Sequence, residues 1–242
     1  MSVSVVIPSW SSERCDKVVE ESLKIQQGEV EFLPTLSHDM GCLSTMQQGA
    51  ERTSANYLCF MHDDAHLRSE AWDAVLEKFF AEHPKCGLVG LGGALKFGHP
   101  WIYKIRYELP QLLRYEFRSN MKEWEKHGTR IVDAERVAFV DGFFLAFRRE
   151  AFMEMGQWKR LKEYGLPEFH CYDLIACIEM IRLGWEIWVL PLLCHHEGGK
   201  TSTTPQYEAV VKHEGFRNGQ ELFEHAHKVA YERGRGILPY WL

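Results

Sequence analysis

An apolar run that ends abruptly in two carboxylates is the feature that most constrains the fold of this chain. The run covers Tyr57–Met61, and His62, Asp63 and Asp64 follow it directly. Open α/β sheets place their ligands at the carboxyl ends of strands, and carboxylate oxygens suit divalent cations. The pattern therefore predicts a buried strand that leads into a cation site. Either aspartate could also cap the helix that is expected to contain Trp72.

Strand and helix patterns alternate along the first half of the chain. Short apolar runs predict strands, whereas periodic apolar residues amid charges predict helices. The expected order is a strand over Val3–Ile7, a helix over Cys15–Gln27 that Gly28 ends, a strand over Val30–Leu33, a helix over Gly41–Ser54 and a strand over Tyr57–Met61. This alternation predicts an α/β fold with a parallel sheet. The chain contains neither G-x-G-x-x-G nor a Walker loop, so the sequence does not support a dinucleotide or P-loop mode of binding.

Composition narrows the class of protein. A chain of 242 residues with 45% hydrophobic residues can form one sizeable core. The net charge of −6 with scattered basic residues indicates no nucleic-acid partner. The seven cysteines include no C-x-x-C pair, so we expect reduced, structural thiols. We find no signal peptide and no apolar stretch long enough for a membrane span, and we expect a soluble, cytoplasmic protein.

The middle of the chain is rich in glycine and aromatic residues. The apolar run Cys86–Leu95 is followed by tyrosines, tryptophans and basic residues. We expect an insertion over about 96–130, which either binds the acceptor or forms a small hydrophobic core under a long loop. A strand over Val137–Phe147 comes next, interrupted by Asp141 and Gly142. A charge inside such an apolar strand needs a specific role.

Two further polar groups stand at element ends in the last third. Asp173 precedes a helix that Gly184 ends, and it could serve as the N-cap of that helix, as a base, or as both. His195 and His196 follow the strand Trp185–Leu190. Imidazoles at a strand end can complete a cation site that a carboxylate begins elsewhere in the sheet. Paired histidines can also be ordinary polar loop residues.

Five segments occur in an order that resembles the family 2 glycosyltransferases of the GT-A fold. They are VSVVIPSW, QQGAERTSANYLCFMHDDAHL, VDGFFLAFRREAF, EFHCYDLIACIEMIRLGWEIWVLP and HHEGGKTS, between Val3 and about Ser202. The resemblance implies a Rossmann-like α/β domain over 1–206 with a mixed, mainly parallel central sheet flanked by helices. Residues 1–95 would form the nucleotide-binding half, 96–206 the acceptor half, and 207–242 a C-terminal helical tail.

The resemblance also implies roles for individual residues. Asp64, with His196 or alternatively His195, matches the ligands of Mn²⁺ or Mg²⁺, and His62 stands where the first aspartate of the D-x-D motif usually stands. Asp173 matches the catalytic base. Residues that would bind the donor are Pro8, Ser9, Trp10, Gln47, His62, Asp63, Asp141 and Gly142. The second strand lacks the acidic residue that recognises the base in many relatives, so the nucleobase is left open.

The function implied by the resemblance is a metal-dependent, inverting transfer of a sugar. The donor would be a UDP-, GDP- or dTDP-linked sugar, and the acceptor a hydroxyl of a glycan, a lipid-linked molecule or another compound. One alternative is a metal-dependent phosphohydrolase that uses His38, Asp39, His62, Asp63 and the later histidines, although such ligands usually lie on helices, whereas His62 and Asp63 follow a strand. Another is a non-catalytic sugar- or nucleotide-binding module on the same fold.

Overall fold

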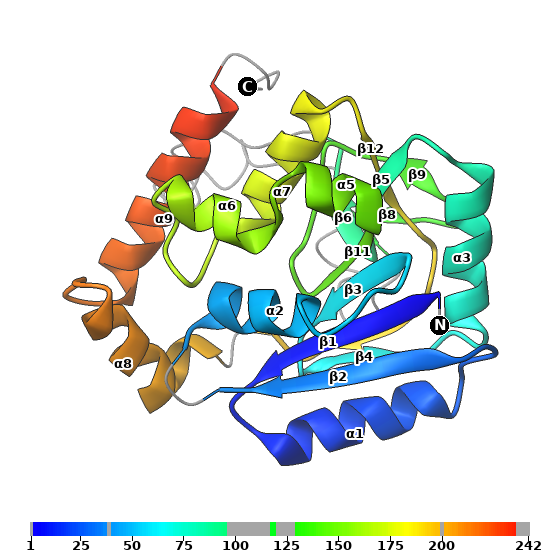
Figure 1. Cartoon of the computed structure of the whole chain (residues 1–242), viewed down its shortest axis with the longest axis horizontal. Coiled ribbons are helices and arrows are strands. Elements are labelled where there is room, and N and C mark those ends of the chain that lie inside the picture. Colours follow the sequence, from blue (N-terminus) through cyan, green and yellow to red (C-terminus); the bar gives the residue numbers. More distant parts are fainter. Residues whose placement is uncertain (1, 38–39, 96–116, 120–128, 199–200, 236–242) are drawn as a thin grey trace.

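A seven-stranded mixed sheet forms the centre of the protein (Figure 1). The structure is a computed structural model that describes residues 2–37, 40–95, 117–119, 129–198 and 201–235. The strands of this sheet, in spatial order, are β2 (Val30–Leu36), β1 (Val3–Ser9), β3 (Tyr57–Met61), β11 (Phe144–Arg148), β5 (Cys86–Gly90), β12 (Glu186–Val189) and β9 (Glu135–Arg136).

Strand direction determines which residues meet at the sheet edge. β1 is parallel to β2 and β3, and β5 is parallel to β12, whereas β11 runs antiparallel between β3 and β5. The start of β11 therefore lies beside the end of β3, where the His62 N–H donates to the Phe143 carbonyl over 2.9 Å. This reversal brings the loop Asp141–Gly142 to the carboxyl end of β3. The strand predicted over Val137–Phe147 is in fact two strands, β10 (Phe139–Val140) and β11, with that loop as the corner between them.

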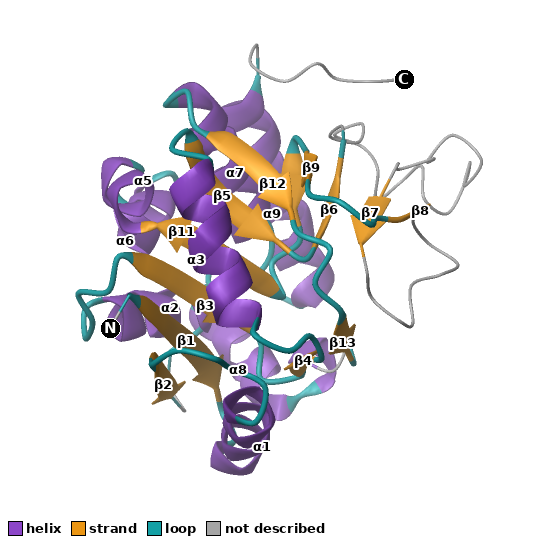
Figure 2. Cartoon of the chain, turned by 90° about the vertical axis from the view of Figure 1, so that its right-hand side faces the viewer, coloured by secondary structure: helices purple, strands orange, loops and turns teal. Residues whose placement is uncertain are grey.

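Helices cover both faces of the sheet. On one face lie α2 (Cys42–Ala50), α5 (Arg149–Glu154), α6 (Gln157–Glu163), α7 (Tyr172–Arg182) and α9 (Gly219–Gly234), and on the other lie α1 (Ser12–Leu23) and α3 (Trp72–Glu82). Figure 2 shows α3 in front of the sheet and α2 behind it. Alternate residues of β1 serve the two faces: Val6 packs into the first core, and Val5 and Ile7 into the second. The result is a three-layer α/β domain.

Two smaller sheets extend this domain. One contains β10, β6 (Gly92–Ala94), β7 (Phe117–Ser119) and β8 (Thr129–Arg130). The other is a ribbon of β4 (Ala65–Leu67) and β13 (Cys194–His196), in which His196 pairs with Ala65. The ribbon places the residues after β3 next to residues late in the chain.

Some predicted helix boundaries are wrong. α1 begins at Ser12 because the Ser11 side chain accepts a hydrogen bond from Arg14 N–H, and it ends at Leu23, well before Gly28. α2 covers Cys42–Ala50 rather than Gly41–Ser54. The proposed cap function of Asp63 or Asp64 is also wrong. β4 separates these aspartates from α3, and the N-cap residue of α3 is Ala71.

The last helices pack onto the same domain. α8 (Pro205–His213) begins after the Thr204 cap, and α9 buries Ala226 and Ala230 in the core shared with α7. The predicted aromatic insertion lies mostly outside the described residues, and so do residues 236–242.

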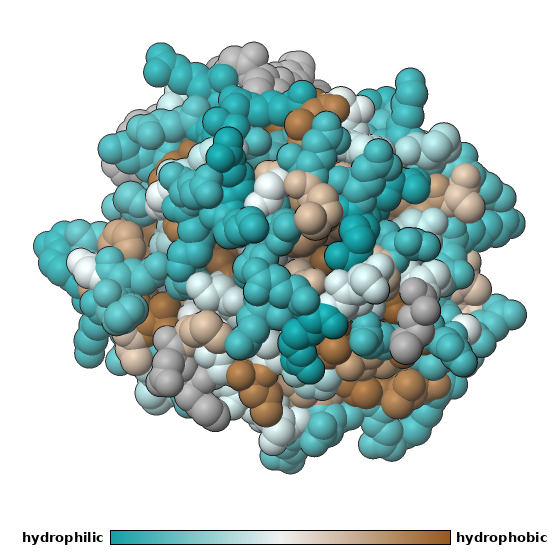
Figure 3. Space-filling view, in the orientation of Figure 1, coloured by the Kyte–Doolittle hydropathy of each residue, from teal (hydrophilic) through white to brown (hydrophobic). Residues whose placement is uncertain are grey.

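The protein surface and thiols complete the description. The face seen in Figure 3 is largely hydrophilic, with apolar residues in small separate groups. Within the described residues, no helix is both long and apolar enough to cross a membrane. All seven cysteines are free, as expected, and six of them are buried.

Candidate functional site

A cleft of about 590 Å³ opens at the carboxyl edge of β1 and β3. Its walls come from the loop after β1, the starts of α2 and α7, the end of β3, β13, and the helices α8 and α9. Ten of the residues that the sequence nominated line it: Pro8, Ser9, Trp10, His62, Asp63, Asp64, Asp141, Gly142, Asp173 and His196. Segments far apart in the sequence therefore meet in one site.

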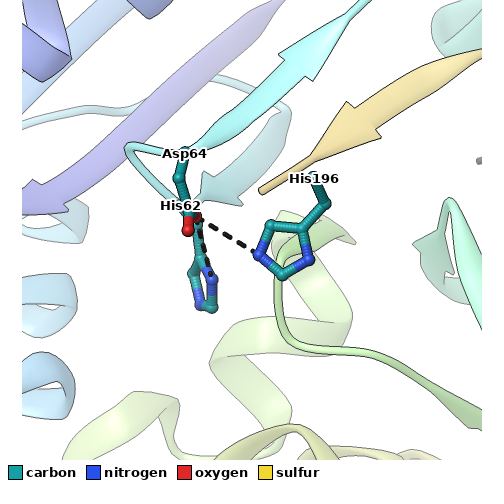
Figure 4. A group of neighbouring side chains, drawn as sticks. All are labelled: His62, Asp64 and His196. Atoms are coloured by element: carbon teal, nitrogen blue, oxygen red, sulfur yellow. Dashed lines mark ion pairs between the residues drawn. The ribbon is translucent and has the colours of Figure 1, made fainter. Parts of the chain in front are cut away.

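Three of these residues form a cluster with the composition of a cation site (Figure 4). His62, Asp64 and His196 each offer one ligand atom, and these atoms lie within 4.8 Å of one another. Asp64 Oδ1 is 3.2 Å from His196 Nε2 and 3.8 Å from His62 Nδ1. Burial by itself would raise the pKa of Asp64, but the hydrogen bond from His196 and the electrostatic interactions with His62, His196 and Arg14 outweigh it and hold the pKa below its usual range. Asp64 is therefore an ionised, buried carboxylate.

The β4–β13 ribbon explains why His196 rather than His195 completes the cluster. The Glu197 N–H donates to the Asp64 carbonyl over 3.1 Å, which fixes the end of β13 against the start of β4. Side chains alternate along a strand, so neighbouring residues face opposite sides. His196 points toward Asp64, and its ring stacks on Phe143 with centroids 4.7 Å apart. His195 lies instead beside His66, with ring centroids 5.8 Å apart.

Tyr172 orients the His62 ring. The Tyr172 hydroxyl lies 2.6 Å from His62 Nε2 and donates to the Gly142 carbonyl over 3.4 Å. In the tautomer that carries its proton on Nε2, the Tyr172 oxygen accepts that proton while its hydroxyl donates to the Gly142 carbonyl, and Nδ1 then presents a lone pair to Asp64. Burial and the neighbouring His196 lower the pKa of His62 to about 4, so the ring is neutral at pH 7. A neutral imidazole with a free nitrogen is the form that binds metals.

Asp63 and Arg14 lie next to this cluster. The guanidinium of Arg14 is 2.9 Å from Asp63 Oδ1 and 3.6 Å from Asp64 Oδ2. Ser9 donates a short hydrogen bond to the other Asp63 oxygen. Burial raises the pKa of Asp63, although Ser9 and Arg14 oppose that shift. The two aspartates after β3 thus differ: Asp64 faces the histidines, whereas Asp63 faces the loop after β1.

Asp173 stands on another wall of the cleft, in the first turn of α7. It is not the N-cap, because that position belongs to Cys171. Its carboxylate accepts hydrogen bonds from Gly142 N–H over 2.9 Å and Leu174 N–H over 2.8 Å. Burial first, and the like charge of Asp141 second, raise the pKa of Asp173 to about 7. A carboxylate of this kind can exchange a proton near neutral pH.

The backbone that carries Asp173 is strained. His170 and Cys171, directly before α7, both have positive φ values, 68° and 58°. Residues other than glycine rarely adopt this backbone conformation, which costs of order 1–3 kcal/mol per residue. Gly142 allows Tyr172 to approach, since a Cβ on Gly142 would lie 2.7 Å from the Tyr172 hydroxyl oxygen. Such strain is found where geometry serves a site.

Two nominated residues lie away from the cleft. Gln47 on α2 donates to Gln157 on α6 over 2.7 Å and accepts from Lys159 N–H, so its side chain joins two helices. His195 is on the other side of β13, as described above. His38 and Asp39, named for the phosphohydrolase alternative, lie outside the described residues.

The sequence interpretation did not include Arg14 and Tyr172. Tyr172 could have been found, because it directly precedes Asp173 in the segment EFHCYD. Arg14 carries no motif; its role depends on the angle at which α1 meets the loop after β1. The aromatic residues of α8 and α9 that line the cleft were also missed, since their apolar spacing is that of any amphipathic helix.

Comparison with solved structures reveals the fold. The chain resembles the crystal structure of GalNAc-T7 with UDP, GalNAc and Mn²⁺ at 13% identity and a TM-score of 0.54. The match covers 87% of this chain and 48% of the other, so this chain spans about half the length of that protein. Together with the family match below, this likeness confirms the predicted mixed α/β GT-A fold.

Two other solved structures give lower scores. The mannosyltransferase PcManGT from Pyrobaculum calidifontis, in complex with GDP-Man and Mn²⁺, has 15% identity and a TM-score of 0.47, covering 95% of this chain and 69% of that one. TarS 1-349 from S. aureus, in complex with UDP-GlcNAc, has 14% identity and a TM-score of 0.49, covering 96% and 71%. The comparison with curated protein sequences found no match.

The sequence itself matches the profile of a known family over most of its length. The match to the Glycosyltransferase like family runs from residue 4 to residue 229, from β1 into α9. It contains the cluster of His62, Asp64 and His196 as well as Asp173. The prediction of a family 2-like glycosyltransferase is thereby confirmed, and the chain belongs to the glycosyltransferase-like family.

Proposed function

We propose that this protein is a metal-dependent, inverting glycosyltransferase that moves a sugar from a nucleoside-diphosphate sugar to an acceptor hydroxyl. The observation that carries the proposal is the shared cleft: the His62–Asp64–His196 cluster and the carboxylate of Asp173 line the same 590 Å³ space. An inverting transfer needs a site that stabilises the negative charge on the leaving diphosphate, and it needs a base that takes the proton of the acceptor hydroxyl.

The residues present fit a divalent cation. Two imidazoles and one carboxylate are ligands common to Mn²⁺ and related cations. His196 Nδ1 is buried and has no hydrogen-bond partner among the described residues, so no bond on that side restricts Nε2 to being a donor. His62, Asp64 and His196 would hold the cation, and when bound it would neutralise the charge that develops on the departing diphosphate.

Asp173 would act as the general base. An acceptor hydroxyl is a poor nucleophile at neutral pH, and a carboxylate within hydrogen-bond reach can take its proton during attack. The oxygen then bonds to the anomeric carbon while the bond from that carbon to the diphosphate oxygen breaks. Because one carboxylate activates the acceptor directly and attack comes from the face opposite the leaving group, the configuration at the anomeric carbon inverts.

The loop after β1 and the corner before β11 would bind the donor. Pro8, Ser9 and Trp10 line the cleft beside Asp63, and Asp141 and Gly142 line it between the cation cluster and Asp173. The donor classes carried over from the sequence are UDP-, GDP- and dTDP-sugars. Gln47 is left out of this proposal because its side chain joins α2 to α6.

A thermal-shift experiment tests the proposal directly. We expect UDP, GDP or dTDP to raise the melting temperature in the presence of Mn²⁺ or Mg²⁺ and not in EDTA, since a ligand that binds only the folded state stabilises it. Asp64→Ala should abolish the shift, whereas the control Asp133→Ala, on an exposed residue outside the cleft, should retain it. Absence of a cation-dependent shift with all three nucleotides would contradict the proposal.

Asp173→Asn separates this function from its alternatives. A transferase should lose turnover with this substitution and keep the nucleotide-dependent shift. A non-catalytic module would show the shift without any turnover in the parent protein, and a phosphohydrolase would release phosphate from substrates without any sugar acceptor. The cytoplasmic location stays a prediction, to which the seven free cysteines are suited.

A further inference from the structure

Aromatic side chains line the cleft on the side formed by α8, α9 and the segment before α7. We call them the aromatic wall, which consists of Trp10, Phe169, His170, Tyr207, Phe223 and His227. None of these residues belongs to the cation cluster, and Trp10 alone was named above for the donor. The wall comes from four places in the chain, so its assembly is a property of the fold rather than of one helix.

The rings of the wall contact one another in a continuous series. Phe169 and Tyr207 have centroids 5.1 Å apart, His170 and Phe223 are 5.2 Å apart, and Phe223 and His227 are 4.3 Å apart. Phe169 and Tyr207 are buried, whereas His170, Phe223 and His227 are half-buried. The inner rings thus support the outer ones, which line the cleft.

The wall is polar at its edges but uncharged. The Tyr207 hydroxyl lies 2.8 Å from His170 Nε2. Burial, with a smaller contribution from His227, lowers the pKa of His170 to about 4, and burial lowers the pKa of His227 to about 4. Both imidazoles are therefore neutral at pH 7. Ring faces with neutral hydrogen-bonding edges suit a sugar ring, which has apolar C–H faces and hydroxyls around its rim.

The rest of the lining argues against two other kinds of ligand. Leu174 is the one leucine, isoleucine, valine or methionine among the described residues that line the cleft, whereas a lipid chain needs a long aliphatic surface. Arg14 is the one arginine or lysine in that same set, and it already pairs with Asp63. The wall therefore offers no cation of its own for a phosphate.

The wall also leads directly to Asp173. His170 precedes Asp173 by three residues, and the strained His170–Cys171 backbone turns the chain from the wall into α7. From these contacts we infer that the aromatic wall is the acceptor subsite and that it takes an uncharged saccharide, with one hydroxyl directed to Asp173. This inference rests on the proposed glycosyltransferase function and names the substrate class of its second substrate.

Saturation-transfer NMR on the full chain tests the inference without turnover. The probes are the methyl β-glycosides of glucose, galactose, mannose and N-acetylglucosamine, compared with glucose 1-phosphate and farnesyl phosphate. At least one neutral glycoside should receive saturation, most strongly at the C–H protons of one ring face. Phe223→Ala and His227→Ala should each weaken its Kd at least fivefold, because each removes a half-buried ring from the wall.

The matched control is His225→Ala. This imidazole lies on the same helix, but it is exposed and bonds to the Gly165 carbonyl outside the cleft. The control should leave the Kd unchanged, and a Phe223→Leu variant with an unchanged melting temperature should still lose affinity. Overturning results are no saturation of any neutral glycoside, equal affinity in the wall variants, or binding of only the phosphorylated probes.

The two proposals fail in different experiments. A missing cation-dependent nucleotide shift contradicts the transferase function, and with it the role of the wall as an acceptor subsite. A normal nucleotide shift together with failed glycoside binding contradicts only the assignment of the wall.

Discussion

The positive charge of Arg14 lies close to Asp64, the carboxylate that would bind the divalent cation. Its guanidinium is close to both Asp63 and Asp64, and 36% of its side chain is exposed. A fixed cation a few ångströms away repels a second one, and the repulsion is larger in a partly buried site than in water. Arg14 would therefore lower the affinity of the proposed cation site in the free protein.

Removing that charge should tighten cation binding. We expect Arg14→Gln to lower the Kd for Mn²⁺ severalfold, measured by isothermal titration without nucleotide. Arg52→Gln, on an exposed arginine outside the cleft, is the control and should leave the Kd unchanged. Weaker binding by Arg14→Gln would instead show that Arg14 orients the carboxylates.

The pKa of Asp173 predicts an acidic limit to activity. Burial and Asp141 raise this pKa to about 7, and a base works only when it is deprotonated. Below pH 7, kcat/KM should therefore fall about tenfold per pH unit. Asp141→Asn removes the like charge, so the pKa of Asp173 should drop and the limit should move to lower pH. The control Asp133→Asn, on an exposed residue, should leave the pH dependence of kcat/KM unchanged. An unchanged pH dependence in Asp141→Asn would contradict an effect of the Asp141 charge on the pKa of Asp173.

The sequence could indicate single site residues when they lay next to the end or the start of a predicted strand or helix. Asp64, His196 and Asp173 each follow or begin a strongly patterned strand or helix, and the structure brings all three to the cleft. Arg14 and Tyr172 could not be predicted in the same way, because their roles depend on distances across the fold that no local pattern encodes.

At the scale of elements, the start of α2 depends on a side chain from far along the chain. Its N-cap residue, Gly41, has no side chain that could cap the helix. Glu168 supplies the cap: its carboxylate accepts from Ser44 N–H over 2.8 Å and from the Ser44 hydroxyl over 2.5 Å, and it pairs with Lys162. Glu168 is 5% exposed. It therefore joins α2 and α6 to the segment that enters α7.

Loss of this carboxylate should destabilise the fold. We expect Glu168→Ala to lower the free energy of unfolding by about 2–3 kcal/mol, because it leaves a buried helix end and Lys162 without their charged partner. Urea unfolding measures the change. The control Glu163→Ala removes an exposed carboxylate on α6 and should cost less than about 1 kcal/mol. Equal losses in the two variants would show that the cap contributes little.

The sequence predicted the bounds of elements with a clear hydrophobic pattern, but it did not predict which elements pair or pack with one another. The strand Tyr57–Met61 has the predicted bounds, because an apolar run with sharp polar ends defines both termini. α1 was placed too late because its true start depends on the Ser11 cap, and Gly28 follows the helix without ending it. The β4–β13 ribbon was not predicted, since three-residue strands carry too little periodicity to be recognised.

On the scale of the whole molecule, one ion pair fastens α9 to the domain. Arg233 Nε lies 2.6 Å from Glu179 Oε1 on α7, its second nitrogen donates to Oε2 over 3.0 Å, and its guanidinium stacks over Tyr164. Glu179 is 6% exposed. The sequence assigned 207–242 to a tail because periodicity predicts a helix without showing what the helix packs against.

Breaking this pair should loosen α9 and the aromatic wall together. We expect Arg233→Met to lower the free energy of unfolding by about 3 kcal/mol, because the buried carboxylate of Glu179 would lose its charged partner and keep only the hydrogen bond from the Tyr164 hydroxyl. The same variant should bind the neutral glycoside probe more weakly, since Phe223 and His227 lie on α9. Chemical denaturation measures the stability, and NMR measures the glycoside affinity. The control Arg217→Met, on a residue whose side chain is 84% exposed, should change neither. Unchanged stability in Arg233→Met would contradict a fastening role.

The β4–β13 ribbon has a consequence for how the molecule unfolds. Asp64 and His196 are separated by more than half of the chain, and the ribbon brings them within 3.2 Å of each other. A cation held between them would close that long stretch into a loop, much as a disulfide does, and would bind only after both strands had formed. A chelator would then remove this closure and lower the stability of the folded chain, while the backbone pairing of β4 with β13 and the packing of α9 would remain.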